Sequence, residues 1–499
     1  NGLTNTIAGA TTFSNTGTVT FGNGGDTINF TGGVTATVPS QVNIAGIVTA
    51  TNSNISIGDS NTPTVLIGHS TISGNTSGNI TLGGTVNGLF ILVLNTTGTT
   101  TLSGTVGDSS ALTSLTTNAS GTTAINGGSV RTSGSQTYND NVTLGAGTTL
   151  TTTSNGSISF VGTVTGVQTL SITTNGTGTT TFTGAVGATN APTSITISTD
   201  VLTAAAIKVS GALSVTNANV STGSTITGII SNGTSAASLT KAGAGKLTLS
   251  GVNTYTGVTT INAGTLSVGT IGDGGVAGNL GQATNSASNL VLGGGTLQYT
   301  GSTASTDRNF TITAGTTGTF DITTNTLTIS GSAAATSGNL TKTGSGILIL
   351  TGTNLQTGIV TLNAGTLSVG AIGNGGSTSS NLSASSNANT NLVLGNGTLI
   401  YTGAGETSDR AFTITAGTTA TIDNSATLTL AGSTVTATTG ALTKTNSGTL
   451  NLTGVNTYTG ATTISAGTLA ITGSGSLNSG SYAGAIANSG AFIYSSSAT

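Results

Sequence analysis

The chain has 499 residues, of which only 4% are charged, and its formal net charge at pH 7 is −3. The absence of cysteine excludes disulfide bonds and cysteine metal sites, and 8 basic residues against 11 acidic ones give no electrostatic basis for binding nucleic acid. The longest strongly apolar run, residues 89–94, is far shorter than the ~20 residues of a membrane-spanning helix, so we expect no such helix in this segment.

Residue types that favour strands and turns dominate the composition. Thr, Val and Ile pack well on a pleated sheet, whereas Gly and Asn favour tight turns. The chain has a single glutamate and few Lys or Arg residues, so several strong helix formers are scarce. We therefore predict an all-β protein with almost no helix.

Residues 1–238 contain an internal echo of 80 residues. The segment Gly98–Gly104, GTTTLSG, returns as Gly178–Gly184, GTTTFTG. We interpret this region as Thr-rich coils of a repeat architecture.

Residues 239–499 contain a longer unit three times. Its copies are Leu239–Leu266, Leu340–Leu367 and Leu442–Leu469, with offsets of 340 − 239 = 101 and 442 − 340 = 102. A fixed period of this kind indicates a stack of structural repeats rather than a globule. We expect both regions to form one continuous rod.

Short strands are indicated by apolar residues two positions apart, such as Leu247 and Leu249 or Phe310 and Ile312. Such pairs bury one face of a strand, and the connections are too short for crossover helices. We predict a parallel β-solenoid with about 20 residues per coil, so that the 80-residue echo spans about four coils and the longer one about five. A tandem array of small sandwiches is the competing interpretation, which the lack of tryptophan disfavours.

The segment Leu239–Leu266 closely resembles the autotransporter-associated β-strand repeat of large bacterial surface proteins. The resemblance lies in its LTKxGxGxLxL start, its NTYxG centre and its INAGTL end. The middle copy departs from the pattern with Gln356 in place of the tyrosine, and the third has Asn446 in place of the first glycine. Residues 1–238 are similar, with lower specificity, to the Thr-rich coils of giant adhesins such as filamentous haemagglutinin.

The resemblance implies a right-handed β-helix displayed outside a Gram-negative cell. It also implies a secretion signal before Asn1, and an outer-membrane barrel after Thr499 would establish the secretion route. The family repeat marks a scaffold and carries no catalytic residue to transfer.

Catalysis is the first alternative, because many β-helices cleave polysaccharides with clustered carboxylates. The one local pair of acids is Glu406 and Asp409, beside Arg410. The preceding unit has Ala304 in place of the glutamate but keeps Asp307 and Arg308, so we favour a polar turn in which the Asp caps backbone amides and the Arg pairs locally. His69 has no cysteine to act with, and we expect it in an exposed turn. We predict no catalytic residue and no enzyme.

Two further patterns concern metals and charge. Asn23–Asp26 hints at a calcium-binding turn, but isolated Asp residues offer too few oxygen ligands, so we predict neither a metal site nor a cofactor. Lys241, Lys342 and Lys444 recur at one place in each repeat. We expect them in solubilising turns that discourage edge pairing, with a sparse charged row as the alternative.

Aromatic and threonine patterns could bind sugars or ordered water. Tyr255 and Tyr458 could stack on sugars, but Gln356 occupies the matching place, so we expect partly exposed rings that cover neighbouring turns. The Thr runs at residues 99–101, 151–153 and 179–181 could make a flat Thr face of the ice-binding type, but the clearest matched runs recur at 80 and not at every coil, which argues against it.

The sequence therefore predicts an extracellular structural β-solenoid on a bacterial cell surface, forming a stalk, fibre or adhesin shaft. It would contact surfaces, glycans or other cells through many weak contacts. The alternative is head-to-tail assembly into a homopolymeric filament, because no capping segment is evident near Asn1 or Thr499. A polysaccharide-processing β-helix enzyme is the third and least favoured interpretation.

Overall fold

The computed structural model describes residues 4–434 and 436–497, which form two compact units, residues 1–256 and 257–499. Within the described residues 49% are in strands and 2% in helices, and in each unit the strands stack in parallel as coils of a β-solenoid. The predicted all-β parallel solenoid is thus confirmed. A change of repeat type at residue 238 and one continuous rod stay predictions. Among the described residues, none of the helices is long and apolar enough to cross a membrane.

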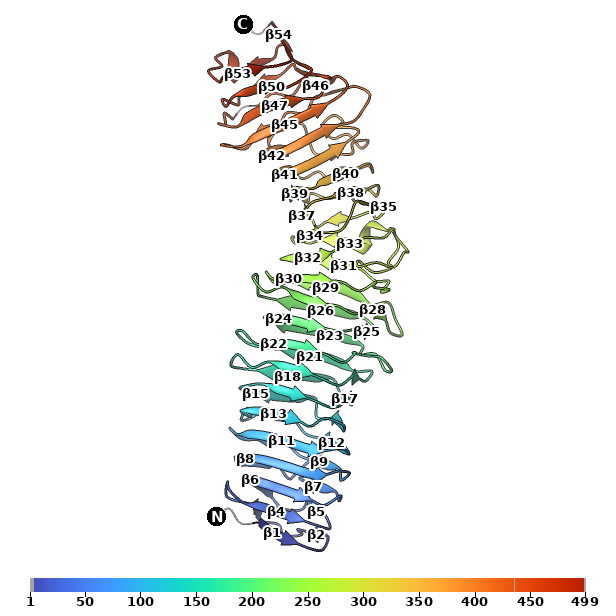
Figure 1. The fold of residues 1–499 in the computed structure, drawn as a ribbon, viewed down its shortest axis with the longest axis vertical. Helices are drawn as coiled ribbons and strands as arrows, with labels where there is room; N and C mark the ends of the chain where they lie inside the picture. Colours follow the sequence, from blue (N-terminus) through green and yellow to red (C-terminus); the bar gives the residue numbers. More distant parts are fainter. Residues whose placement is uncertain (1–3, 435, 498–499) are drawn as a thin grey trace. The chain divides into compact units, whose positions relative to one another are not determined.

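In residues 1–256, successive strands of one coil fall into three columns, and each column is a parallel ladder (Figure 1). The first column contains β1 (Thr4–Ile7), β4 (Thr27–Phe30), the second halves of β6 (Gln41–Ala50) and β8 (Thr64–Asn75), β11 (Ile91–Thr96), β13 (Ser114–Thr117), β16 (Gln136–Tyr138), β19 (Ile158–Phe160), β22 (Thr179–Phe182), β24 (Val201–Ala204), β27 (Ser224–Ile226) and β30 (Lys246–Leu249). The second column contains β2 (Thr11–Thr12), β5 (Val34–Ala36), β7 (Ile55–Ile57), β9 (Ile80–Leu82), β12 (Thr99–Leu102), β14 (Thr122–Ile125), β17 (Asn141–Leu144), β20 (Val164–Thr165), β25 (Ile207–Val209) and β28 (Ile230–Asn232). The third column contains β3 (Thr18–Phe21), the first halves of β6 and β8, β10 (Val86–Asn87), β15 (Ser129–Thr132), β18 (Thr148–Thr152), β21 (Thr169–Thr173), β23 (Ser194–Thr199), β26 (Ala212–Asn217) and β29 (Ser238–Ala242).

The coils contain roughly 22 residues each, slightly more than the predicted 20. The 80-residue echo, predicted to span about four coils, does not span a whole number of them, because its two copies lie in different columns. Thr100 pairs with Thr123 in the second column, whereas Thr180 pairs with Ile158 in the first. The repeated sequence therefore moves round the coil by one strand position from copy to copy.

The core consists of side chains that alternate inward along each short strand. Leu115 and Leu150, like most aliphatic residues of the columns, are fully buried, and the residues beside them in sequence face outward. Three aromatic rings continue this core in successive coils. Phe160 stacks between Tyr138 and Phe182, with ring centroids 5.0 and 4.9 Å apart.

In residues 257–499, two long columns carry the second and third repeats. The Lys342 column contains β32 (Thr265–Val268), β34 (Thr296–Tyr299), β37 (Thr317–Ile322), β39 (Asn339–Thr343), the first halves of β41 (Val360–Val369) and β42 (Leu392–Tyr401), and β44 (Thr413–Ile414). The Lys444 column contains β35 (Ala304–Thr306), β38 (Thr326–Ile329), β40 (Ile347–Leu350), the second halves of β41 and β42, β45 (Thr419–Asn424), β47 (Ala441–Thr445), β50 (Thr462–Ile464) and β53 (Ile486–Asn488).

The remaining elements of this unit form shorter parallel ladders and single helical turns. The ladders are β31 (Thr259–Ile261) with β33 (Leu290–Leu292) and β36 (Thr311–Ile312); β43 (Glu406–Ser408) with β46 (Leu428–Leu430), β48 (Thr449–Leu452), β51 (Thr468–Gly473) and β54 (Ala491–Ser496); and β49 (Val455–Asn456) with β52 (Ser476–Leu477). The 3-10 turns are η1 (Ala287–Asn289), η2 (Asn389–Asn391) and η3 (Asn478–Gly480).

Two coils of this unit are much longer than the others. Thr265 pairs with Thr296, an offset of 31, and Val360 pairs with Leu392, an offset of 32. The extra residues form two long loops, residues 269–289 and 370–391, which we name loop 1 and loop 2. The 101–102-residue period, predicted as about five coils of one common length, therefore includes one extended coil, so the common length was wrong for this unit.

The aromatic stack supplies a stability test. We expect Phe160→Ala to lower the free energy of unfolding by about 3–5 kcal/mol, because it removes a buried ring and opens a cavity between two others. Urea unfolding of the whole chain, monitored by circular dichroism, measures the change. The outward Ser159→Ala is the matched control and should change stability by less than about 0.5 kcal/mol. Equal effects of the two substitutions would contradict the stacked core.

Candidate functional site

The lysine of each repeat is buried. Lys241, Lys342 and Lys444 are at most 1% exposed, so the expectation of a solubilising surface position was wrong. Each lysine lies two residues after an inward leucine, such as Leu340 before Lys342, and so shares its face of the strand. This spacing was the signal in the sequence that could have predicted burial.

Each lysine ammonium binds carbonyl oxygens of the turn that follows it. Lys241 Nζ donates to the carbonyls of Ala242 and Gly243 at 2.7 and 2.8 Å. Lys342 Nζ donates to Thr343 and Gly344 at 2.6 and 2.9 Å. The third lysine, Lys444, binds the carbonyls of its own turn in the same way.

In that turn Lys444 Nζ donates to Thr445 and, at 2.8 Å, to the carbonyl of Asn446. We name these segments, residues 241–245, 342–346 and 444–448, the lysine turns. The carbonyls supply the compensation that a buried ammonium requires.

Burial lowers the pKa of all three lysines. It brings the pKa of Lys241 and of Lys342 to about 8, and it lowers that of Lys444 in the same direction. The charged row considered as an alternative is also wrong for residues 257–499. There Lys342 pairs with Phe320 in one column and Lys444 pairs with Ile422 in the other.

A buried arginine holds each long loop. Arg308, which is 3% exposed, donates from Nε to Gly272 O at 2.8 Å, from Nη2 to Gly281 O at 2.8 Å and from Nη1 to Ala283 O at 3.1 Å. All three acceptors lie in loop 1. The guanidinium therefore ties distant parts of the loop to the coil that follows it.

Loop 2 has the same arrangement. Arg410 donates from Nε to Gly373 O at 3.0 Å, from Nη2 to Ser383 O at 2.6 Å and from Nη1 to Ser385 Oγ at 2.9 Å. Its pKa is lowered by burial, an effect that the nearby carboxylates of Asp409 and Glu406 oppose.

The acids beside these arginines bind backbone amides of the loops. Asp409 Oδ1 accepts the amide of Gly375 at 2.7 Å, and Glu406 Oε2 accepts that of Ile372 at 2.9 Å. In the preceding unit Asp307 accepts from Gly274 at 2.7 Å. The amide-capping role favoured from the sequence for the aspartates is therefore what the structure shows, and Glu406 has the same role although it was not predicted. The expected local pairing of the arginine was wrong for Arg410, because its guanidinium donates to carbonyls of loop 2. Their oxygens are engaged in holding a loop, which does not suit an acid–base pair facing a substrate.

His69 lies at a shallow groove in residues 1–256. Its Nδ1 accepts the amide of Ile91 at 3.1 Å, and its ring meets Phe90 edge to face. Asp26 and Ile47 line the same groove. Within the described residues, no group of three or more His, Cys, Asp or Glu side chains is placed to hold a metal ion.

The repeat tyrosines are core residues, not the partly exposed rings we expected. Tyr255 is fully buried, Tyr458 is 4% exposed, and the equivalent Gln356 is fully buried. Gln356 Nε2 donates to Leu382 O at 3.1 Å, so a loop 2 carbonyl accepts from the amide nitrogen of the side chain that replaces a ring. A buried ring cannot stack on a sugar.

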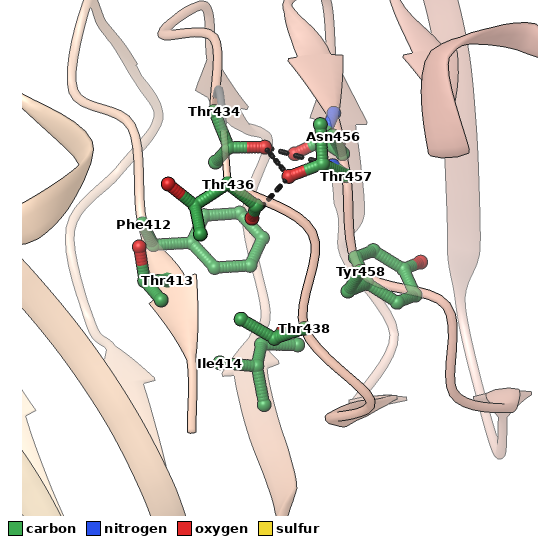
Figure 2. Close-up of a pocket in the computed structure, with 9 residues that line it drawn as sticks. All are labelled: Phe412, Thr413, Ile414, Thr434, Thr436, Thr438, Asn456, Thr457 and Tyr458. Carbon is green, nitrogen blue, oxygen red and sulfur yellow. Dashed lines mark hydrogen bonds between the residues drawn. The ribbon is translucent and has the colours of Figure 1, made fainter. Parts of the chain in front are cut away.

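Tyr458 lines a small internal cavity of about 10 Å³. Figure 2 shows Phe412 and Ile414 on one side, with the hydroxyls of Thr434 and Thr457 pointing toward each other at 2.7 Å. The volume is at the lower limit for one water molecule, so the cavity is a packing gap between coils and not a ligand site.

Outward hydroxyls form a continuous row on the first column. The row consists of Thr116, Thr137, Ser159, Thr181, Thr203, Thr225 and Thr248, one residue in each successive coil. Within the part of the chain that the structure describes, none of these hydroxyls hydrogen-bonds to the protein. The expectation that Thr positions lack coil-by-coil regularity was wrong, because the sequence echo follows a different period from the coil.

The buried Lys342 should make the free energy of unfolding rise with pH. The rise should occur between about 8, the pKa of this lysine in the folded chain, and the ordinary pKa of a lysine side chain. The folded pKa lies below the unfolded one, so in this window the unfolded chain binds more protons, and raising the pH favours the folded state. Lys342→Met should reduce this slope, measured by urea unfolding from pH 7 to 9.5, whereas Met at the exposed Lys246 should leave it unchanged. An identical slope in Lys342→Met would contradict a perturbed lysine.

Arg410→Met should loosen loop 2, because each buried carbonyl that loses its donor costs about 1–3 kcal/mol. Hydrogen exchange measured by mass spectrometry should show faster exchange confined to loop 2 and the adjoining strands. Arg131→Met, at an exposed position, is the control. Unchanged exchange in loop 2 would show that the guanidinium does not hold it.

Comparison with known proteins agrees with this geometry. A family model described as the passenger-associated-transport repeat matches residues 239–268, 340–369 and 442–471, the segments that contain the lysine turns. The chain is 37% identical over 252 residues to a protein of Brucella suis biovar 1 (strain 1330) named "Adhesin BmaC autotransporter". The match covers 48% of this chain but only 7% of that relative. No solved structure matches the chain. With the parallel β-solenoid, these repeats and this similarity support an autotransporter-type β-helical passenger.

Proposed function

We propose that the chain is part of an extracellular β-solenoid shaft on a bacterial surface, which attaches cells to surfaces or to other cells. The observation that carries the proposal is the 37% identity to a protein named as an autotransporter adhesin, in a chain that folds as stacked coils. The activity of the whole relative is part of the proposal, because this chain spans a small share of its length.

The surface chemistry supports contact rather than catalysis. Charged residues are 4% of the chain, and Glu406 and Asp409 are engaged by loop amides. The outward hydroxyl row offers many equivalent weak contacts at a spacing of about 4.8 Å. Avidity of many such contacts suits attachment, since no single strong site is needed.

Attachment can be tested with beads that carry the purified chain. Coated beads should bind to epithelial cells or to bacteria more than uncoated beads do. Replacing three row residues by lysine, Thr137, Thr181 and Thr225, should weaken attachment several-fold, because each exposed cation interrupts the neutral row. The same three positions changed to serine are the control. Attachment no greater than that of uncoated beads would contradict the proposal.

A further inference from the structure

The strands around the lysine turns do not determine their own register by apolar pattern. In β39, Leu340 and Lys342 face inward, and in the following coil Val360 and Leu362 do so. Because side chains alternate with a period of two, a shift of two residues keeps every inward residue inward. Burial of aliphatic residues therefore selects the face of the strand and leaves two-residue shifts open.

The lysine turn has a specific partner in the next coil. Lys342 Nζ reaches the carbonyl of Ala364 at 3.3 Å, in addition to its two turn carbonyls. The neighbouring Gly365 has φ of +66°, and a Cβ atom there would lie 2.2 Å from Gly344 O and 2.8 Å from Lys342 Nζ. Only glycine fits over this turn.

The third repeat has the same close approach. Gly467 has φ of +67°, and a Cβ atom there would lie 2.3 Å from Asn446 O and 2.4 Å from Gly448 O. The spacing from lysine to glycine is identical, since 365 − 342 = 23 and 467 − 444 = 23. The Ala-Gly-Thr end of the repeat therefore lies over the lysine turn at its start.

We propose that the buried lysine and the glycine 23 residues later form a register lock, which allows the next coil to pair in one register only. A shift of two residues would bring Asn363 or Leu367 over a turn that has room only for glycine. It would also separate the ammonium from the Ala364 carbonyl inside the core. Both penalties destabilise only the shifted registers. The buried lysine, although costly to bury, therefore makes the pairing of the two strands specific.

Engineered cysteines can report the register, because the chain has none of its own. Thr341 and Thr361 are direct partners that face outward, so cysteines at both positions report the native register. Cysteines at Thr341 and Asn363, or at Thr341 and Ile359, report shifts of two residues in either direction. Each pair is introduced with the native lysine, with Lys342→Met and with Leu362→Met, the last as a control for an altered core residue in the same column.

After refolding from urea and mild oxidation, the chain with Lys342 should form the native disulfide and almost none of the shifted ones. With Lys342→Met, the shifted disulfides should increase about tenfold relative to the native one. Leu362→Met should behave as the native chain does. Native crosslinking alone in Lys342→Met would overturn the proposal.

If Lys342→Met prevents folding, the native cysteine pair, oxidised in that variant before denaturant is removed, supplies the decisive measurement. A lock that sets register predicts that this covalent link restores the β-sheet circular dichroism. Failure of the link to restore folding would show that the lysine stabilises the turn without choosing the register. Neither outcome depends on whether the chain acts in attachment.

Discussion

In-register parallel stacking of short strands is the constraint on which the rest of this structure depends. Each coil satisfies its backbone through the coils on either side, and its inward side chains pack on residues of the same column. Leu340 meets Val360 and Leu348 meets Leu367 in this way. Because every coil repeats this contact, the chain needs few aromatic residues and few charges to fold.

Buried cations are the second theme. Among the described residues, five of the 8 basic side chains are buried, and each of them donates to backbone carbonyls. They are the three lysines of the lysine turns and the two arginines that hold the long loops. Turns and loops of a solenoid concentrate carbonyl groups that the ladders do not use. A long basic side chain can satisfy several of them at once from inside the coil, as Arg308 does in loop 1.

The sequence predicted the strands and their parallel arrangement because period-two apolar pairs such as Leu247 and Leu249 carry that information directly. It did not predict where Lys342 or Tyr458 lies. Residue type alone places a lysine at the surface, and only the turn carbonyls that receive its ammonium make burial acceptable. The sequence shows that Leu340 and Lys342 are two positions apart and so share one face of a strand. Whether a lysine can be buried on that face depends on the carbonyl acceptors that the fold brings together.

The candidate site was predicted in part. The sequence favoured Asp409 as a cap of backbone amides, and the structure shows the amide that it binds. It did not predict that Glu406, in β43, also binds a loop amide or that Arg410 binds loop carbonyls. The hydroxyl row was missed because the sequence analysis followed the 80-residue echo, whereas row residues such as Thr137 and Ser159 pair at the coil spacing of about 22 residues. The coil period is set by the turns and is hidden in sequence by repeats that shift round the coil.

The distance between spin labels at Thr116 and Thr225 tests the stacked solenoid most directly. These residues lie five coils apart in one row, so electron paramagnetic resonance should give a narrow distribution near ~24 Å, widened by the label side chains. A broad distribution, or a separation far beyond that value, would show that the coils do not stack in register.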